Sequence, residues 1–382
     1  MTSVPAFEKV HLQRRDLPAP VRSLFVVVLL YTFLVGVAFL ETGIGAMGEG
    51  FQEGLLRSVA NPLSGLFAGI LATVLVQSSS VSTSTIVGMV GAGTLPVSLA
   101  VPMIMGANIG TTVTNTLASL GSIRRSGEFQ RGFAAATVHD SFNLMAVLVL
   151  LPLELATGFL THSSVWLTEL LRGAEFDPAS PPRSPIRMAV RMPVEAVEPF
   201  LGVGTLPGLI FLSIGLALIF FALAFITRNM RQLVAGGVER MMNQFIGRGG
   251  GTVGIFVGIA VTVAVQSSTI TTSILVPLVA AGVLSLPNAY PITVGANVGT
   301  TITALLASLA VVRPEGLTIA LVHTLFNFSA IAVIFPIRRV RLLPVRIAQT
   351  VAAVAVRKHW LVFTYVLGLF LVLPLMGIFL IR

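Results

Sequence analysis

The sequence predicts an all-α integral membrane protein: an inverted-topology repeat with two re-entrant helical hairpins and about seven full transmembrane spans. Of the 382 residues, 55% are hydrophobic and only 10% are charged, and the mean hydropathy is +0.93. Soluble domains carry roughly a quarter charged residues, so this composition indicates a bilayer. The other two observations are a series of apolar runs of membrane-crossing length and an internal repeat that relates the two halves of the chain.

Seven apolar runs approach the length of a membrane-crossing helix, which needs about 20 residues. They cover 23–40, 97–120, 133–157, 202–226, 288–311, 318–336 and 360–381. Two further runs, 62–95 and 251–286, are interrupted by polar residues and are not simple spans. No small-residue cleavage site follows the first run, so we expect a retained anchor rather than a signal peptide.

The distribution of positive charge predicts the orientation. With the tail 1–22 placed in the cytoplasm, the loops on that side carry 17 Lys and Arg residues, and the other side carries 7. Cytoplasmic loops are normally the basic ones. The net charge of +9 is therefore attributed to membrane orientation, and no nucleic-acid partner is expected. The absence of Cys excludes disulfides, thiolate metal sites and a Cys nucleophile.

These features divide the chain into parts. A first repeat covers 23–157 and a second covers 201–336, and each contains one of the interrupted runs. The Pro-rich segment 158–200 between them is expected to be an extracytoplasmic linker loop, not a folded domain. The last part, 337–382, combines a basic amphipathic segment with the final span. That segment, like 228–246, is expected to lie in the inner membrane interface.

The repeat becomes visible when the chain is shifted by 189 residues. VQSSSVSTSTIVGMVGAGTL, from Val76, then aligns with VQSSTITTSILVPLVAAGVL, from Val265. From Val76 to Leu120, 24 of 45 positions are identical. Unrelated apolar segments would share on the order of five. HDSFN at 139–143 likewise matches HTLFN at 323–327, so each half carries the same set of polar motifs.

Three predicted spans separate Gln77 from Gln266, and an odd number inverts the second copy relative to the membrane. Seven of the nine residues in QSSSVSTST bear hydroxyls. An unbroken helix could bond these hydroxyls to its own carbonyls, but two half-helices meeting at a buried polar tip are the better interpretation. GANIGTT at 106–112 and GANVGTT at 295–301 are predicted to break the facing helices, because Gly and Asn accept unusual backbone angles.

The tips lie in blocks without charged side chains, 58–123 and 249–312. A site built only from hydroxyls, amides and backbone groups can bind two kinds of ligand, a small anion or a monovalent cation. Helix N-termini bind small anions, and carbonyl, amide and hydroxyl oxygens coordinate hard monovalent cations. Since no Lys or Arg lies at the tips, anion binding there would depend on co-bound cations.

Asp140 lies inside the span 133–157, where an acid is costly and is a functional candidate. Its counterpart in the second copy is Thr324, so we interpret Asp140 as a cation ligand found in one half only. Structural pairing of the carboxylate is the alternative. The matched His139 and His323 are expected to be neutral and to hydrogen-bond a backbone carbonyl.

Asn143 and Asn327 end the two matched HxxFN motifs. Each can cap or bridge a broken helix, or ligate an ion, and both interpretations stay open. The matched Ser and Thr clusters could serve only helix packing. Packing, however, does not require a Gln before the cluster in both copies.

The paired QSSS and QSST tips, the GANIGTT and GANVGTT pair and FAAATVHDSFN followed by VLVLLPLE resemble the type II sodium–phosphate cotransporter family, from about Asn61 to Phe379. The resemblance implies uptake of inorganic phosphate coupled to sodium by alternating access at a midplane site, in the cell (inner) membrane. Sodium would be the coupling ion, with no other cofactor and no enzymatic activity. It implies phosphate contacts from Ser78, Ser79, Ser80, Ser267, Ser268 and Thr269. It implies sodium ligands among Gln77, Asn108, Thr111, Thr112, Asp140, Asn143, Gln266, Asn297, Thr300, Thr301 and Asn327.

Family members with an Asp at the position of Asp140 are electrogenic, which implies three sodium ions with one divalent phosphate. One departure bears on this stoichiometry. Many animal members have a Gln and an Asp of a sodium site where this sequence has Ser122 and Arg125. The family's last span is also missing, so the C-terminus is expected outside. The expected partners are phosphate, sodium and the lipid bilayer, and a homodimer is allowed.

Three other functions are compatible with parts of this pattern. A sodium-coupled carrier of another small anion, such as a dicarboxylate or sulfate, could use the same paired tips. A passive anion channel would explain neither the inverted symmetry nor the oxygen-rich motifs. A membrane-embedded enzyme with a Ser nucleophile would need His139 and Asp140 to act together. Neighbouring residues on a helix point about 100° apart, and a catalytic serine needs no duplicate.

Overall fold

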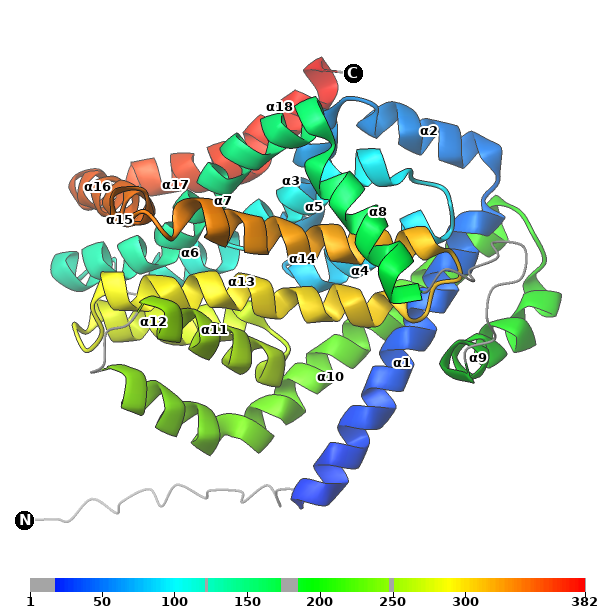
Figure 1. The fold of residues 1–382 in the computed structure, drawn as a ribbon, viewed down its shortest axis with the longest axis horizontal. Coiled ribbons are helices and arrows are strands. Elements are labelled where there is room, and N and C mark those ends of the chain that lie inside the picture. The colour runs from blue at the N-terminus through cyan, green and yellow to red at the C-terminus, as the bar shows by residue number, and fades with distance from the viewer. Residues whose placement is uncertain (1–17, 121–122, 173–184, 247–250, 382) are drawn as a thin grey trace, which may run out of the picture.

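The computed structural model describes residues 18–120, 123–172, 185–246 and 251–381. Every regular element in these ranges is a helix, which confirms the predicted all-α membrane protein. The helices are α1 (Ala19–Ala46), α2 (Glu49–Val59), α3 (Pro62–Val76), α4 (Ser79–Gly91), α5 (Val97–Gly110), α6 (Val113–Ser119), α7 (Ser126–Thr157), α8 (Phe159–Arg172), α9 (Pro185–Leu201), α10 (Thr205–Ile246), α11 (Gly251–Val265), α12 (Ser268–Ala280), α13 (Leu286–Ser308), α14 (Pro314–Ile334), α15 (Arg338–Arg341), α16 (Leu343–Arg357), α17 (Trp360–Leu367) and α18 (Leu373–Leu380), with a π-helical turn at Gly368–Val372. In Figure 1, α13 and α14 run side by side through the middle of the molecule.

Six of the seven predicted spans form helices that are long and apolar enough to cross a membrane. They are α1, the stretch Val97–Leu117 across α5 and α6, α7, the part of α10 over Thr205–Arg231, α14, and Trp360–Leu380. The seventh predicted span, 288–311, forms α13. This helix has 23 residues, so its length of about 35 Å is sufficient. Four Thr residues and two Asn residues make it less apolar than the other six.

The two interrupted runs form hairpins of short helices. In the first, α3 has 15 residues and α4 has 13; in the second, α11 has 15 and α12 has 13. At 1.5 Å per residue these arms are about 20–22 Å long, shorter than the roughly 30 Å of a hydrocarbon core. The amphipathic α2 enters the first hairpin at an angle of 103° to α3. Each hairpin therefore has the dimensions of a segment that enters a membrane without crossing it.

Glycine pairs bring each hairpin into backbone contact with a neighbouring helix. A Cβ added at Gly69 of α3 would lie 2.0 Å from the Met103 carbonyl oxygen of α5, and a Cβ at Gly106 would lie 2.0 Å from that of Leu66. The second half repeats this contact. Gly258 of α11 and Gly295 of α13, each 189 residues later, show the same 2.0 Å approach to opposing carbonyl oxygens. These glycines permit close packing, in addition to any role in loosening a helix.

The helices that precede the hairpins in their halves, α1 and α10, pack in the same manner. Gly36 faces Gly215, and Gly43 faces Gly208, with added Cβ atoms 2.7–3.0 Å from the opposing glycine carbonyl oxygens. Because the higher number on one helix faces the lower number on the other, the two helices are antiparallel. An antiparallel arrangement of equivalent helices is what an inverted repeat requires.

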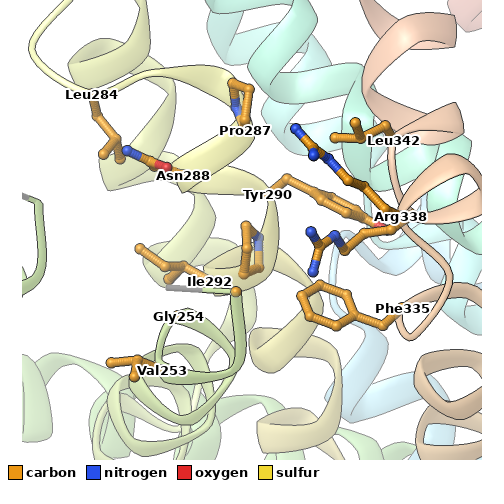
Figure 2. A pocket seen from close by; sticks show the side chains of 13 residues that line it. Val253, Gly254, Leu284, Pro287, Asn288, Tyr290, Ile292, Phe335, Arg338 and Leu342 are labelled. Carbon is orange, nitrogen blue, oxygen red and sulfur yellow. The ribbon is translucent and has the colours of Figure 1, made fainter. Parts of the chain in front are cut away.

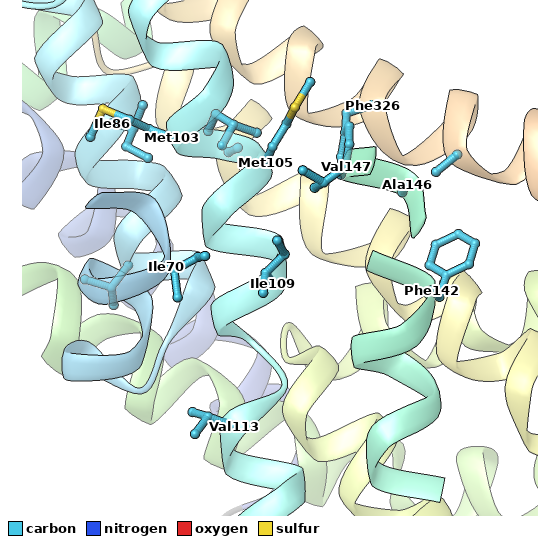
Figure 3. Packing of buried hydrophobic residues seen from close by; sticks show 14 of the residues in the cluster. Ile70, Ile86, Met103, Met105, Ile109, Val113, Phe142, Ala146, Val147 and Phe326 are labelled. Atoms are coloured by element: carbon cyan, nitrogen blue, oxygen red, sulfur yellow. The ribbon is translucent and has the colours of Figure 1, made fainter. Parts of the chain in front are cut away.

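An apolar core encloses the helices that carry the polar motifs. Phe142 and Phe326, which directly precede the asparagines of the two HxxFN motifs, are 1% and 0% exposed. Figure 3 shows Phe142 and Ala146 on α7, Phe326 on α14, and Met105 and Ile109 on the facing α5. The side chains of these motifs are therefore packed among apolar residues inside the protein.

The segment 158–200 is more structured than its Pro-rich sequence predicts, and the expected loop is wrong for most of its length. Leu160, Ser164 and Thr168 of α8 recur every four residues and are buried where α8 packs on α14. On α9, Val190 and Val194 are buried next to α1. Amphipathic flanks therefore form helices on either side of 173–184, which holds three of the six prolines and lies outside the described residues.

The basic segments take two forms. The predicted amphipathic helix near the C-terminus is α16, which buries Val345, Ala348, Ala352 and Ala355 against α7. Segment 228–246, expected to be a separate interfacial helix, instead continues α10, which changes direction in its second half (Figure 1). Most of the predicted cytoplasmic tail lies outside the described residues.

Candidate functional site

The tips of the two hairpins meet at one pocket of about 350 Å³. It is lined by Val76, Gln77, Ser78, Ser79, Ser80 and Val81 from the first hairpin and by Gln266, Ser267, Ser268, Thr269 and Ile270 from the second. Phe220, Leu223, Ala224 and Thr227 of α10 complete the lining. The structure thus brings together all six hydroxyl residues expected to contact phosphate and both glutamines. No charged side chain lines this pocket within the described residues.

The backbone at each tip is held in an unusual conformation. Gln77 and Gln266 have φ angles of +55° and +56°, and no other described non-glycine residue has a positive φ. The left-handed backbone conformation is costly for a residue with a side chain of this size. Residues held in it are concentrated at functional sites. The turn ends the first arm and lets Ser78 and Ser267 begin the second, where each Oγ accepts the backbone N–H three residues ahead at 3.3 Å. The N-termini of α4 and α12 therefore open on the pocket with their N–H groups and positive dipole ends.

The hydroxyls after each tip fall into two groups. Ser82 and Ser84 donate to the carbonyl oxygens of Ser78 and Ser80 at 3.1 and 2.7 Å, one turn back in their own helix. Thr272 likewise donates to the carbonyl of Ser268. The hydroxyls of Ser79, Ser80, Ser268 and Thr269, in contrast, bond to no described residue. The cluster is thus partly satisfied inside its helices, as the unbroken-helix alternative allowed, and partly open toward the pocket.

Each tip glutamine is tied to its own half by its amide group. Gln77 donates to the Val74 carbonyl at 2.5 Å and accepts from Thr114 Oγ1 at 2.8 Å. Gln266 donates to Val263 at 2.7 Å and accepts from Thr303 Oγ1 at 3.5 Å. Sequence reasoning missed these two threonines. They are 189 residues apart, so the repeat itself contained the signal that could have identified them.

A second group of polar residues lies where α5, α7, α13 and α14 meet, and it links the two repeats. Asn143 donates to the backbone carbonyl of Asn108 at 2.7 Å, and Asn297 donates to Asn143 Oδ1 at 2.7 Å. Asn327 donates to Asn108 Oδ1 at 3.3 Å, and its own buried Oδ1 has no partner among the described residues. Each HxxFN asparagine therefore contacts the GAN asparagine of the opposite repeat. These four are separate from the tip pocket.

The backbone-carbonyl bonds expected for the two histidines are wrong. Neither buried ring bonds a backbone carbonyl within the described residues. His139 Nε2 donates to the side-chain oxygen of Asn297, and the Nδ1 atoms of His139 and His323 have no partner there. The asparagine network provides a side-chain acceptor that could not be identified from one sequence segment alone.

The four predicted threonines of the GAN motifs bond back to their own helices. Thr111 and Thr300 donate to the carbonyls of Ala107 and Ala296, four residues earlier, at 2.9 and 3.0 Å. Thr112 and Thr301 donate three residues back, to Ile109 and Val298, at 2.8 Å in both cases. Their hydroxyl oxygens keep acceptor capacity, but none of the four lines the tip pocket.

The predicted helix breaks differ between the halves. Thr111 and Thr112 separate α5 from α6, as expected, whereas α13 continues without interruption through GANVGTT, so the second predicted break is wrong. The motifs are alike, but the residues that follow them are not. Asn115 and Thr116 of the first copy correspond to Ala304 and Leu305 of the second. Ala and Leu favour a helix, whereas Asn and Thr offer the backbone competing hydrogen bonds.

Asn115 also carries a contact that sequence reasoning missed. Its side chain donates to Thr272 Oγ1 at 2.6 Å and accepts from Ser273 Oγ at 3.0 Å, so α6 of the first half holds α12 of the second. The sequence signal that could have identified this contact is the mismatch between Asn115 and Ala304 in an otherwise matched motif.

Asp140 lies in a separate buried cluster. Its side chain is fully buried, Oδ2 accepts from the Tyr365 hydroxyl at 2.7 Å, and Oδ1 has no hydrogen-bond partner among the described residues. The hydroxyls of Thr112 and Thr116 lie close to the carboxylate. Its neighbours are hydroxyls, and no described basic side chain forms an ion pair with this carboxylate. A buried acid with an open oxygen among hydroxyls is suited to receive a cation.

Tyr365 belongs to α17, in the last described span, and was not anticipated because nothing in the repeat includes it. In the second half Thr324 takes the place of Asp140, and its hydroxyl donates to the Ala320 carbonyl at 3.1 Å. Of the two residues that depart from the family pattern, Arg125 pairs with Glu128 at 3.1 Å on the surface. The other, Ser122, lies outside the described residues.

This chain is a multi-pass helical membrane protein with two equivalent halves, which meet at their hairpin tips. The family model described as Na+/Pi-cotransporter matches residues 32–163 and 218–372, so the chain belongs to that family. It is 36% identical over 424 residues to "Sodium-dependent phosphate transport protein 2A" of Ovis aries, covering 91% of this chain and 66% of that protein. It is 31% identical over 433 residues to "Sodium-dependent phosphate transport protein 2B" of Homo sapiens, covering 90% and 62%. The chain thus spans just under two thirds of the length of these relatives. No solved structure matches.

Proposed function

We propose that this protein is a secondary active symporter that couples inward sodium movement to the uptake of inorganic phosphate. The observation that carries the proposal is the pocket in which both tips converge, with two helix N-termini and hydroxyls that have no other described partner. The proteins to which the chain is similar are named for sodium-dependent phosphate transport, which supports the same substrate and coupling ion.

Phosphate binds in the pocket through N–H groups and hydroxyls. Ser79, Ser80, Ser268 and Thr269 donate to the phosphate oxygens, and the N-termini of α4 and α12 stabilise its negative charge. An uncharged lining gives weak anion binding by itself, because moving an anion out of water is costly without a compensating charge. Co-bound sodium supplies that charge, so an empty or half-loaded carrier holds phosphate poorly and coupling follows.

Sodium binds at oxygen-rich positions away from the tips. Asp140, with the hydroxyls of Thr112, Thr116 and Tyr365, provides one carboxylate site in the first half only. The asparagine network offers neutral oxygens, among them Asn327 Oδ1, which is buried and unpartnered within the described residues. With a third sodium at Asp140 and one divalent phosphate, each cycle moves one net positive charge inward. Each 100 mV of potential then adds about 2.3 kcal/mol to the driving force.

Alternating access exposes this site to one side of the membrane at a time. One repeat moves against the other, as in other inverted-repeat carriers. The contacts that would exchange are the polar ones between halves, such as Asn115 with Thr272 and Asn297 with Asn143. The glycine contacts within each half keep each hairpin fixed to its own facing helix during this motion.

The serine, histidine and aspartate side chains that a serine enzyme would combine lie apart in this protein. The tip serines line the pocket, whereas His139 bonds Asn297 and Asp140 bonds Tyr365. No Ser–His–Asp relay is formed, so transport accounts for these residues better than hydrolysis.

The test is uptake of radiolabelled phosphate into proteoliposomes, with an inward sodium gradient or choline, and with sulfate and a dicarboxylate as competitors. We expect uptake that requires sodium and is not reduced by a tenfold excess of either competitor. Uptake abolished by sulfate or the dicarboxylate would reassign the substrate to another small anion. Equal uptake in choline would reject sodium coupling.

A further inference from the structure

A second polar pocket, of about 350 Å³, lies at the other end of the second hairpin, where α11 begins. Its lining comes from four elements: the first turn of α11, the start of α13 with the turn before it, the end of α14, and α15 with Leu342. The residues that matter are Tyr290, Asn288, Arg338, Arg341 and Gly251. None of the tip residues lines this pocket, so it is distinct from the site described above.

The pocket contains an unsatisfied buried donor. Tyr290 is 1% exposed, yet its hydroxyl has no hydrogen-bond partner among the described residues. Phe335 lies next to it, with ring centroids 6.3 Å apart, and Figure 2 shows Tyr290, Phe335 and Arg338 together in the lining. An unpaired buried hydroxyl is costly, and in a polar, accessible pocket it indicates a place for a ligand or a water molecule.

Positive charge surrounds this hydroxyl. Arg341 stacks on Phe335, 5.0 Å from its ring centroid, and is close enough to Tyr290 to interact with it electrostatically. A Cβ added at Gly251 would lie 3.2 Å from Arg341 Nη1, so the guanidinium lies beside the first residue of α11. Arg338 lines the same pocket, and neither arginine forms an ion pair with a described carboxylate. No Asp or Glu is among the lining residues.

These groups converge on one kind of ligand. Two guanidinium groups, a tyrosine hydroxyl, the Asn288 amide and the N–H groups in the first turn of a 15-residue helix are all donors, and the helix adds its positive dipole end. Planar arginine forks and helix N-termini are the usual elements of phosphate recognition. The exposed rim of the pocket includes the apolar Val253, which is 39% exposed, and Ile337, just before α15 and outside the lining, is 59% exposed.

We propose that this pocket binds a phosphate group and, when occupied, ties the first arm of the second hairpin to the basic segment α15. The shared chemistry is a phosphate with at least two free oxygens, carried by an anionic phospholipid or present as the free ion. The exposed apolar rim favours the phospholipid headgroup. Because α11 leads directly to the tip at Gln266, occupancy would restrict the movement of one hairpin and so regulate turnover. The proposal does not depend on the transported substrate.

The test uses the full-length protein, stripped of lipid in detergent and kept in sodium-free choline buffer. One arm titrates a short-chain phosphatidic acid against the matching phosphatidylcholine, and a second arm titrates inorganic phosphate. Binding is followed by the melting temperature and by native mass spectrometry. The variants are Arg341→Ala and Tyr290→Phe, the second of which keeps the packed ring. Arg339→Ala is the matched control, because it removes the same charge from α15 at a residue outside the pocket lining.

We expect saturable binding in at least one arm, weakened tenfold or more by Arg341→Ala and about threefold by Tyr290→Phe, with Arg339→Ala within twofold of the unmodified protein. Binding of phosphatidic acid alone assigns the lipid headgroup, and binding of inorganic phosphate assigns the free ion. Absence of binding in both arms would overturn the proposal. An equal loss in Arg339→Ala and Arg341→Ala would also overturn it, since that result means diffuse attraction to a basic surface. If Arg341→Ala does not fold, an unchanged affinity in Tyr290→Phe is the contradicting result.

Discussion

The two halves of the molecule share their hairpins and differ in the helices that face them. Both tips place a left-handed glutamine before a serine cap, and both are held by a glycine pair and a threonine at equivalent positions. Only the first half has a broken helix after its GAN motif, a carboxylate at Asp140 and a polar bridge through Asn115. The shared features surround the proposed phosphate pocket, and the unshared ones surround the proposed additional cation site. Under the proposed function, the duplicated parts would bind the substrate, and the divergence of one half would determine the charge moved with it.

The largest effect is expected from breaking a feature that both halves share. Gly69→Val and Gly258→Val each place side-chain atoms against a carbonyl oxygen already 2.0 Å from an added Cβ. We expect each to destabilise the protein by more than about 3 kcal/mol and to abolish recovery of folded protein, measured by size-exclusion chromatography and melting temperature. Gly54→Ala is the control, because nothing lies within 4 Å of its added Cβ. A stable Gly258→Val protein would show that the two halves are not packed alike.

The next effect concerns the tips. Ser79→Ala and Ser268→Ala, at equivalent positions, each remove a hydroxyl that has no other described partner. A hydrogen bond to a charged group contributes about 1.5–3 kcal/mol, so we expect the half-saturating phosphate concentration to rise roughly tenfold or more in each variant. Sodium-dependent uptake at varied phosphate concentration measures this.

Ser84→Ala is the matched control for the tip variants, because that hydroxyl already bonds the Ser80 carbonyl and faces its own helix. A tenfold change in only one of the two tip variants would mean that phosphate contacts a single hairpin and that the convergence of the tips is structural.

A smaller effect is expected where the halves differ. Asn115→Ala gives the first copy the residue of the second and removes two bonds to α12. We expect a few-fold change in maximal uptake, for a loss of about 0.5 kcal/mol per bond, with little change in phosphate affinity. The reciprocal variant Ala304→Asn puts a larger polar side chain at a fully buried position, so it should lower the melting temperature. An affinity change in Asn115→Ala equal to that of a tip variant would place this residue in the phosphate site.

The smallest effect is expected from Tyr365→Phe, which keeps the ring and removes the hydroxyl that bonds Asp140. The carboxylate loses one of several hydroxyl neighbours, so we expect the half-saturating sodium concentration to rise about threefold while the phosphate affinity at saturating sodium stays the same. A phosphate defect without a sodium defect would contradict the assignment of Asp140 to a cation.

The sequence predicted the parts of this structure that depend on local pattern or on the repeat. The helical spans, the short hairpin arms and the gathering of six hydroxyl residues at two equivalent tips belong to this group. It did not predict that the GAN glycines also mediate helix contact, because close approach depends on which helix lies opposite. Tyr365 and the asparagine contacts were missed for the same reason, since they join segments more than 150 residues apart. The helices of the linker 158–200 were missed because the prolines of this segment dominated the interpretation of its amphipathic flanks.

In the proposed mechanism, duplicated positions bind phosphate, while Asp140, present in one half only, adds a charge. The most direct test is the ratio of charge to phosphate moved, measured in proteoliposomes from current and radiolabel uptake together. We expect one positive charge per phosphate in the unmodified protein and in Thr324→Ala, and electroneutral, sodium-dependent uptake in Asp140→Asn. An Asp140→Asn protein that still moves one charge per phosphate, or an unmodified protein that moves none, would contradict it.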